Sequence, residues 1–233
     1  MKPVLWVAMS LLLVGITSFN TVAAEENGGI ISGRVSWHGK DQPSAIISNA
    51  IDPIVCGKEI KVQAIEVDGK TRGLQHVVVS IENILPQSHT LPSRKIIVRN
   101  IECRFWPPVD AAQLGNNVEV QNQDPILHNT HISLENRTVL NVAQLANSRP
   151  IRKPLKRPGL YSIRCDKHKF MVGALMVYDH PYFAVTDAEG RFQLPRLVAG
   201  TYNIQAWHEM LGTLSHEVVV PAEGTVDIHF AYP

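Results

Sequence analysis

The 233-residue sequence predicts an all-β protein, and three observations support that fold class. Apolar and polar residues alternate, as in half-buried strands, at 75–81, 117–121, 161–165, 202–207 and 226–230. Fifteen prolines and fifteen glycines separate such segments at short intervals, which is typical of a β-sandwich or barrel. The best helical candidate, residues 140–147, is long enough for about two turns at most.

The first 24 residues have the pattern of a secretory signal peptide. Lys2 gives a positive start, residues 4–19 are uncharged and mostly apolar, and Val22-Ala23-Ala24 places small residues before Glu25. The alternative is a permanent membrane anchor, but this run is marginal for a bilayer core about 30 Å thick. We therefore expect cleavage after Ala24, export to the periplasm or beyond, and no stable membrane span afterwards.

Net charge points to no class of partner. Removing Lys2 from 22 basic residues leaves 21, against 21 acidic residues. The cysteines are more informative, because an exported chain favours disulfides and three cysteines cannot all pair internally. The odd thiol is the first indication of a metal site.

Cys165 stands at the end of a predicted strand. Alternation places Tyr161, Ile163 and Cys165 on one face, which points inward on a half-buried strand. The next six residues contain His168 and Met171, and another apolar strand begins at about residue 174. One loop between two strands thus offers a thiolate, an imidazole and a thioether.

A second loop, residues 124–131, follows another strand and carries His128. Two histidines, one cysteine and a weak axial methionine are the ligands of blue copper sites, whose geometry suits both Cu(I) and Cu(II). Asn129 is expected to orient the first histidine and to tie the two loops together. We therefore predict a site for one copper ion with the ligands His128, Cys165, His168 and Met171.

At these residues the chain resembles the cupredoxins, and within them the amicyanin and plastocyanin group. The family's late loop, in its amicyanin form Cys-x-x-His-x-x-Met, stands as residues 165–171, and its early His-Asn-x-His run as residues 128–131. The resemblance covers residues 92–180 and implies a Greek-key sandwich or barrel with copper at these four ligands. Amicyanin has proline after the second histidine, where this chain has Lys169, so charge replaces apolar docking surface. His131 is expected to point away from the metal.

Cys56 and Cys103 remain, 47 residues apart. Export favours a disulfide between them, and the alternative is a second soft-metal site, with His38 or His76. Covalent haem is not indicated, because the sequence contains no Cys-x-x-Cys-His.

Residues 28–91 and 181–233 are interpreted as two segments of one domain. The segments 31–35, 186–192 and 199–202 resemble the carboxypeptidase regulatory-like domain, a small transthyretin-like β-sandwich without catalysis of its own. This predicts a second small β-sandwich that the copper-binding domain, residues 92–180, interrupts. Trp207-His208-Glu209 is expected to be a strand end and loop, although its histidine could suggest a second site.

Eight basic residues and one acidic residue, Asp166, lie between Arg149 and Lys169. The cupredoxin resemblance implies that the ring edge of His168 lies nearest to solvent, flanked by Lys167 and Lys169. These two lysines are expected to attract an acidic redox partner, and the alternative is an ordinary solvated loop. Nucleic acid is not expected as a partner, because the chain is exported and this run lacks interleaved aromatic residues.

The ligand set favours an electron carrier over a catalyst, that is, a type 1 copper protein that transfers single electrons between redox partners. The main alternative is a periplasmic module for copper storage or delivery. A copper enzyme would need an open coordination position or a second copper centre. A fourth class is an adhesion or carbohydrate-binding module that merely keeps the fold.

Overall fold

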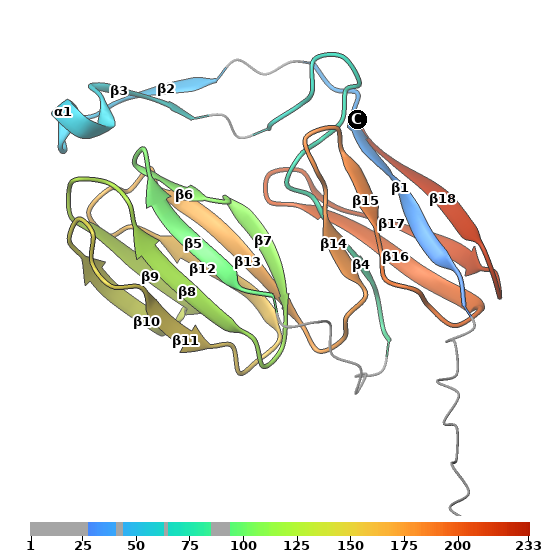
Figure 1. The fold of residues 1–233 in the computed structure, drawn as a ribbon. Helices are drawn as coiled ribbons and strands as arrows, with labels where there is room; N and C mark the ends of the chain where they lie inside the picture. The colour runs from blue at the N-terminus through green and yellow to red at the C-terminus, as the bar shows by residue number, and fades with distance from the viewer. Residues whose placement is uncertain (1–27, 41–43, 63–64, 85–93) are drawn as a thin grey trace, which may run out of the picture.

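The computed structural model describes residues 28–40, 44–62, 65–84 and 94–233 (Figure 1). The predicted signal peptide, residues 1–24, lies outside these residues. The described residues form eighteen strands and one four-residue helix, α1 (Pro53–Cys56), which confirms the all-β fold class. None of the described helical structure is long and apolar enough to cross a membrane.

The central sandwich is built from two sheets and holds the predicted metal ligands. One sheet has the strand order β10-β9-β12-β13-β7 and the other has the order β11-β8-β5-β6. Buried residues of both sheets, among them Val120, Ile132 and Leu175, form its core. The strands are β5 (Ile96–Ile101), β6 (Arg104–Trp106), β7 (Val109–Gln113), β8 (Asn117–Asn122), β9 (His128–Leu134), β10 (Arg137–Gln144), β11 (Ile151–Pro154), β12 (Gly159–Arg164) and β13 (Val172–Tyr178).

The outer sandwich combines strands from both ends of the described chain. Its sheets have the orders β15-β1-β18 and β14-β4-β16-β17. β1 runs parallel to β18, and a Cβ on Gly33 would collide with the carbonyl oxygen of Ile228, so this approach requires glycine. The strands are β1 (Ile30–Trp37), β4 (Val78–Ile81), β14 (Phe183–Val185), β15 (Arg191–Gln193), β16 (Gly200–His208), β17 (Gly212–Val220) and β18 (Thr225–Tyr232).

A third element, here called the arm, comprises residues 44–62. Strands β2 (Ala45–Ser48) and β3 (Glu59–Val62) pair antiparallel, and α1 lies at the tip between them. Figure 1 shows the arm reaching from the outer sandwich across one end of the central sandwich. The arm therefore belongs to neither pair of sheets, although its residues precede β4 of the outer sandwich.

Two local predictions were wrong. Residues 137–144 form strand β10, so the helical candidate at 140–147 is extended over most of its length. The reason is tertiary: β10 pairs antiparallel with β9, and these sheet hydrogen bonds outweigh a weak local preference for helix. The loop assigned to 124–131 ends earlier than expected, because β9 begins at His128.

Candidate metal centre

The turn between β12 and β13 brings three of the predicted ligands together. The backbone N–H of Met171 donates to the carbonyl of His168 (2.9 Å), and that of Cys165 donates to the carbonyl of Met171 (3.3 Å). The N–H of His168 donates to Sγ of Cys165 (3.3 Å). The Cys165 and Met171 side chains are each 1% exposed and His168 is fully buried, so the turn directs all three inward.

His128 completes the cluster from the start of β9. β9 pairs with β12 through Ile132 and Ile163, which places its first residue beside the β12–β13 turn. The rings of His128 and His168 lie 4.7 Å apart, measured between centroids. One ligand atom each from His128, Cys165 and His168 lies within 4.8 Å of the others. The structure thus brings together residues that are up to 40 positions apart in the sequence.

In both imidazoles an aspartate holds Nε2, which leaves Nδ1 as the nitrogen available to a metal. Nδ1 of His168 lies 3.7 Å from Sγ of Cys165. Nδ1 of His128 is buried and has no hydrogen-bond partner among the residues that the structure describes, an arrangement that costs free energy unless another group binds it. Burial first, with the positive groups nearby, holds the pKa of His128 below its ordinary value despite Asp124. A neutral ring with a bare nitrogen is ready to bind a metal.

An aspartate binds the outer nitrogen of each ring. Asp124 Oδ2 lies 2.7 Å from Nε2 of His128, and Asp52 Oδ2 lies 3.0 Å from Nε2 of His168. Carboxylate partners of this kind fix the ring orientation and increase the basicity of the nitrogen that binds metal. Together with the donor set, these contacts fit a type 1 copper site with two histidines, one cysteine and one methionine.

Asp124 is itself held in place by the backbone. The N–H groups of Glu102 and Cys103 donate to its two carboxylate oxygens at 2.7 and 2.9 Å. Cys103 pairs with Cys56 of the arm in a disulfide, which confirms the predicted pair. Cys103, Asp124 and His128 also lie close enough together to suggest a metal cluster, but the disulfide removes the Cys103 thiolate as a ligand. Cys165 is the free cysteine.

Asn129 bridges the two loops that carry the ligands. Its Oδ1 accepts a hydrogen bond from the N–H of Asp166 (2.7 Å), and its Nδ2 donates to Asn141 of β10. His131 points elsewhere: its ring nitrogens lie 3.2 Å from Asp166 Oδ1 and 2.8 Å from Thr138 Oγ1. His131 therefore takes no part in the cluster.

The expected exposure of His168 was wrong. The resemblance implied that its ring edge lies nearest to solvent, but the ring is fully buried because Asp52 of the arm covers Nε2. Asp52 Oδ2 also lies 2.6 Å from Nζ of Lys167. Hydrogen bonding by Lys167 first, and then by His168, holds the pKa of Asp52 below its usual range. Lys167 and Lys169 are both exposed, and Lys167 is ion-paired to the arm.

Neither aspartate was predicted from the sequence. Asp124 could have been recognised from the sequence, since it lies four residues before His128 in a loop that was predicted to carry a ligand. Asp52 could be linked to the site only indirectly, since it lies four residues before Cys56, which was expected to pair with Cys103. Its contact with a ligand depends on the path of the arm, which no local pattern predicts.

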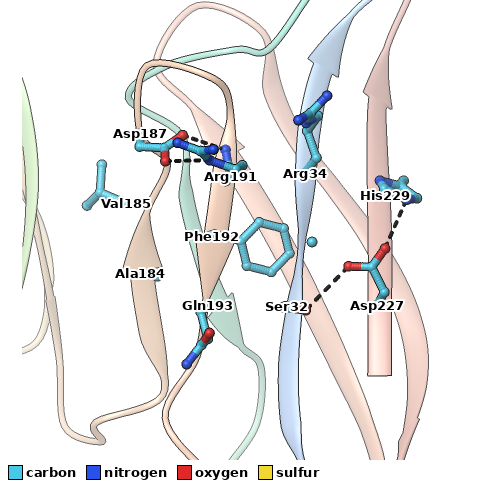
Figure 2. Close-up of a pocket in the computed structure, with 11 residues that line it drawn as sticks. Ser32, Arg34, Ala184, Val185, Asp187, Arg191, Phe192, Gln193, Asp227 and His229 are labelled. Carbon is cyan, nitrogen blue, oxygen red and sulfur yellow. Dashed lines mark hydrogen bonds and ion pairs between the residues drawn. The ribbon is translucent and has the colours of Figure 1, made fainter. Parts of the chain in front are cut away.

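The outer sandwich has a separate hollow of about 600 Å³ (Figure 2). Its acidic side chains are paired with basic ones: Arg191 Nε lies 2.9 Å from Asp187 Oδ2, and His229 Nε2 lies 3.1 Å from Asp227 Oδ2. Ser32 donates to the other oxygen of Asp227 (3.3 Å). Both acidic side chains that line the hollow, Asp187 and Asp227, are thus paired with basic groups.

No family model and no curated protein matches the chain. Solved structures do match over part of it. A copper-containing nitrite reductase from Thermus scotoductus SA-01 is 21% identical with a TM-score of 0.32, over 41% of this chain and 25% of the reductase. A mutant of amicyanin with Cu(I) is 17% identical with a TM-score of 0.34, over 43% and 98% of the two chains. A purple cupredoxin from Nitrosopumilus maritimus is 19% identical with a TM-score of 0.32, over 36% and 100%.

Proposed function

We propose that this protein is an exported type 1 (blue) copper protein that transfers single electrons between redox partners. The observation that carries the proposal is the cluster of His128, Cys165 and His168, in which Nδ1 of His128 is buried without a hydrogen-bond partner among the described residues. Bound copper would supply a one-electron couple between Cu(I) and Cu(II). The protein's own contribution is a set of ligands that are fixed before the metal arrives.

Rigidity of the ligands favours electron transfer over storage or delivery. Asp124 and Asp52 hold the outer nitrogens of the two histidines, and Asn129 ties the loops. Ligands held by these hydrogen bonds are expected to keep one geometry in both oxidation states, so little reorganisation opposes electron transfer, and their burial excludes water. A delivery protein must release its ion, and the buried thiolate of Cys165 under the arm opposes release. Storage or delivery therefore ranks second.

The outer sandwich is proposed to be a carboxypeptidase regulatory-like module without catalysis, on the sequence resemblance of its turns. Export is proposed from the amino-terminal pattern, and the Cys56–Cys103 disulfide supports it. The redox partner is proposed to be acidic where it meets Lys167 and Lys169.

Titration of the purified protein with Cu(II) tests the copper site. One equivalent should bind and give intense visible absorption, because thiolate-to-copper charge transfer requires Cys165. Cys165→Ser replaces a soft sulfur by a hard hydroxyl, so colour and tight binding should both be lost. Met171→Leu should keep the colour and raise the reduction potential, because the thioether is only a weak axial ligand. Full colour in Cys165→Ser would disprove the ligand assignment.

Electron transfer needs its own measurement. The copper-loaded protein should be reduced and reoxidised repeatedly by small redox mediators without loss of metal. Loss of copper on each reduction would support delivery in place of electron transfer.

A further inference from the structure

A cavity of about 290 Å³ lies between the two sandwiches, beside the arm. β3 of the arm forms one side, and the turn between β16 and β17 forms another. Met171, the expected axial ligand, contributes to the wall. The cavity is at the small end of the range for ligand sites, which are commonly found where domains meet. Its size suits a molecule with a single ring.

Aromatic and apolar side chains of the central sandwich form most of the wall. Trp106 is half exposed and packs edge to face against His76, with ring centroids 6.1 Å apart at 88°. Phe170 belongs to the loop that carries Cys165, His168 and Met171, and its ring centroid lies 5.7 Å from that of His168. Flat rings on the wall favour a flat, apolar occupant, because aromatic pairs stabilise by more than their buried area alone. The other apolar side chains of this wall are Phe105, Val109 and Val172.

The opposite wall offers polar groups from the outer sandwich. The backbone N–H of Met210 donates to Nδ1 of His208 (3.2 Å), so a neutral His208 ring carries its proton on Nε2 and is a donor there. Burial first, and then the like charge of His76, lowers the pKa of His208 to about 4. Nε2 of His76 is buried, 3.3 Å from Glu66 Oε2, without a hydrogen bond of good geometry. Both imidazoles line the cavity.

Charges around the cavity balance. Lys61 and Arg104 are positive, and Glu66 and Glu209 are negative. Arg104 already donates from Nη2 to the carbonyl of Lys61 (3.0 Å). The cavity therefore has no net charge with which to attract an ion, and it favours an uncharged ligand.

We propose that this cavity binds a small uncharged aromatic molecule that carries a hydroxyl group, such as a phenol. The ring packs against Trp106 and its apolar neighbours, and the hydroxyl binds to His76 and His208. A molecule bound there lies against Met171. Binding does not depend on the metal, but the spectral effect described below rests on the proposed copper site.

Calorimetric titration of the full, copper-free protein with phenol tests the proposal. Saturable binding of one phenol is expected. Cyclohexanol has the hydroxyl but no aromatic ring, and it should bind at least tenfold more weakly. Benzoate and benzylamine carry opposite charges, and both should also bind more weakly than phenol. Absence of saturable phenol binding would overturn the proposal, and preference for either ion would overturn the choice of an uncharged ligand.

Two variants locate the site. Trp106→Ala removes a half-exposed ring and should weaken phenol binding at least tenfold. His208→Asn keeps an acceptor for the N–H of Met210 but removes the Nε2 donor, so it should weaken phenol binding and leave toluene binding unchanged. Ile54→Ala, at an almost fully exposed position on α1, is the matched control and should bind as the parent does. Unchanged binding in Trp106→Ala would exclude this cavity.

Copper gives a second readout. Phenol should shift the visible absorption of the copper-loaded protein, because the occupant lies against Met171. The colourless Cys165→Ser variant should still bind phenol with the parent's affinity. If the parent binds phenol but shows no visible absorption with copper, only the copper proposal is refuted. If saturating phenol leaves the visible absorption unchanged, the proposed contact with Met171 is refuted.

Discussion

Asp52 and His168 lie 116 residues apart in the sequence, yet the carboxylate of one covers the ring of the other at 3.0 Å. The same oxygen binds Nζ of Lys167 at 2.6 Å. The edge of the imidazole from which an electron would leave therefore faces a residue of the arm and not solvent.

Asp52→Asn and Asp52→Ala should both raise the reduction potential. A negative charge beside the ligand stabilises Cu(II) more than Cu(I), so its removal favours reduction. A shift on the order of 50 mV is expected, because about 59 mV corresponds to about 1.4 kcal/mol for one electron, and charged hydrogen bonds contribute about that much. Only Asp52→Ala should also speed electron exchange with small complexes, because asparagine still covers the ring. Voltammetry and stopped-flow kinetics measure these effects, and an unchanged potential in both variants would contradict them.

Removal of the disulfide should destabilise the protein and free the arm. The bond closes a loop of 47 residues, for which chain entropy gives about 4 kcal/mol. Urea unfolding of the double variant Cys56→Ala with Cys103→Ala measures the loss. In the unfolded, copper-free parent, thiol titration should find one reactive thiol, that of Cys165. Three reactive thiols would show that the bond is absent.

Acid should weaken the fold partly through His208. Burial first, and then the charge of His76, lowers its pKa to about 4 from an ordinary value of 6.5. Between these values the unfolded chain binds more protons than the folded one. The stability that His208 contributes is therefore complete above pH 6.5 and is lost as pH falls towards 4. The loss amounts to about 3 kcal/mol at most. The free energy of unfolding of the copper-free protein, measured at pH 7 and pH 4.5, should fall less in His208→Asn than in the parent. Equal decreases in the two proteins would refute the prediction.

Lys169 should contribute more to the docking of an acidic partner than Lys167. Both side chains are exposed, but Lys167 is paired with Asp52 and presents less free charge. At low ionic strength, Lys169→Gln should slow electron exchange with a negatively charged redox protein more than Lys167→Gln does. Near 1 M salt, where the Debye length is about 3 Å, all rates should converge. If both variants and the parent exchange electrons at the same rate at low salt, the basic segment between Arg149 and Lys169 is an ordinary solvated loop.

The sequence predicted the parts of the site that local pattern determines. Cys165, His168 and Met171 fall within seven residues at the end of an alternating strand, so their spacing was informative. The pairing of Cys56 with Cys103 followed from the expectation of export and from an odd number of cysteines. The all-β fold followed from alternation and from the frequency of glycine and proline.

Contacts that depend on the path of the chain could not be predicted in this way. His168 was expected at the surface because nothing local shows that the arm crosses the site. His76 and His208 come near each other only because β16 pairs with β4 in the same sheet, although more than a hundred residues separate the two strands in the sequence. The strand at Arg137–Gln144 depends on its partner β9, which a window of eight residues does not contain.

On the proposed function, the arm also bears on when a metal can enter. Asp52 covers one ligand, and four residues later Cys56 is bonded to Cys103, whose backbone holds the aspartate that binds the other ligand. On the proposed function, an ion would have to pass the arm to reach these ligands, and the disulfide limits the movement of the arm. Copper uptake is therefore expected to be faster while Cys56 and Cys103 are still reduced, and slower once they are bonded.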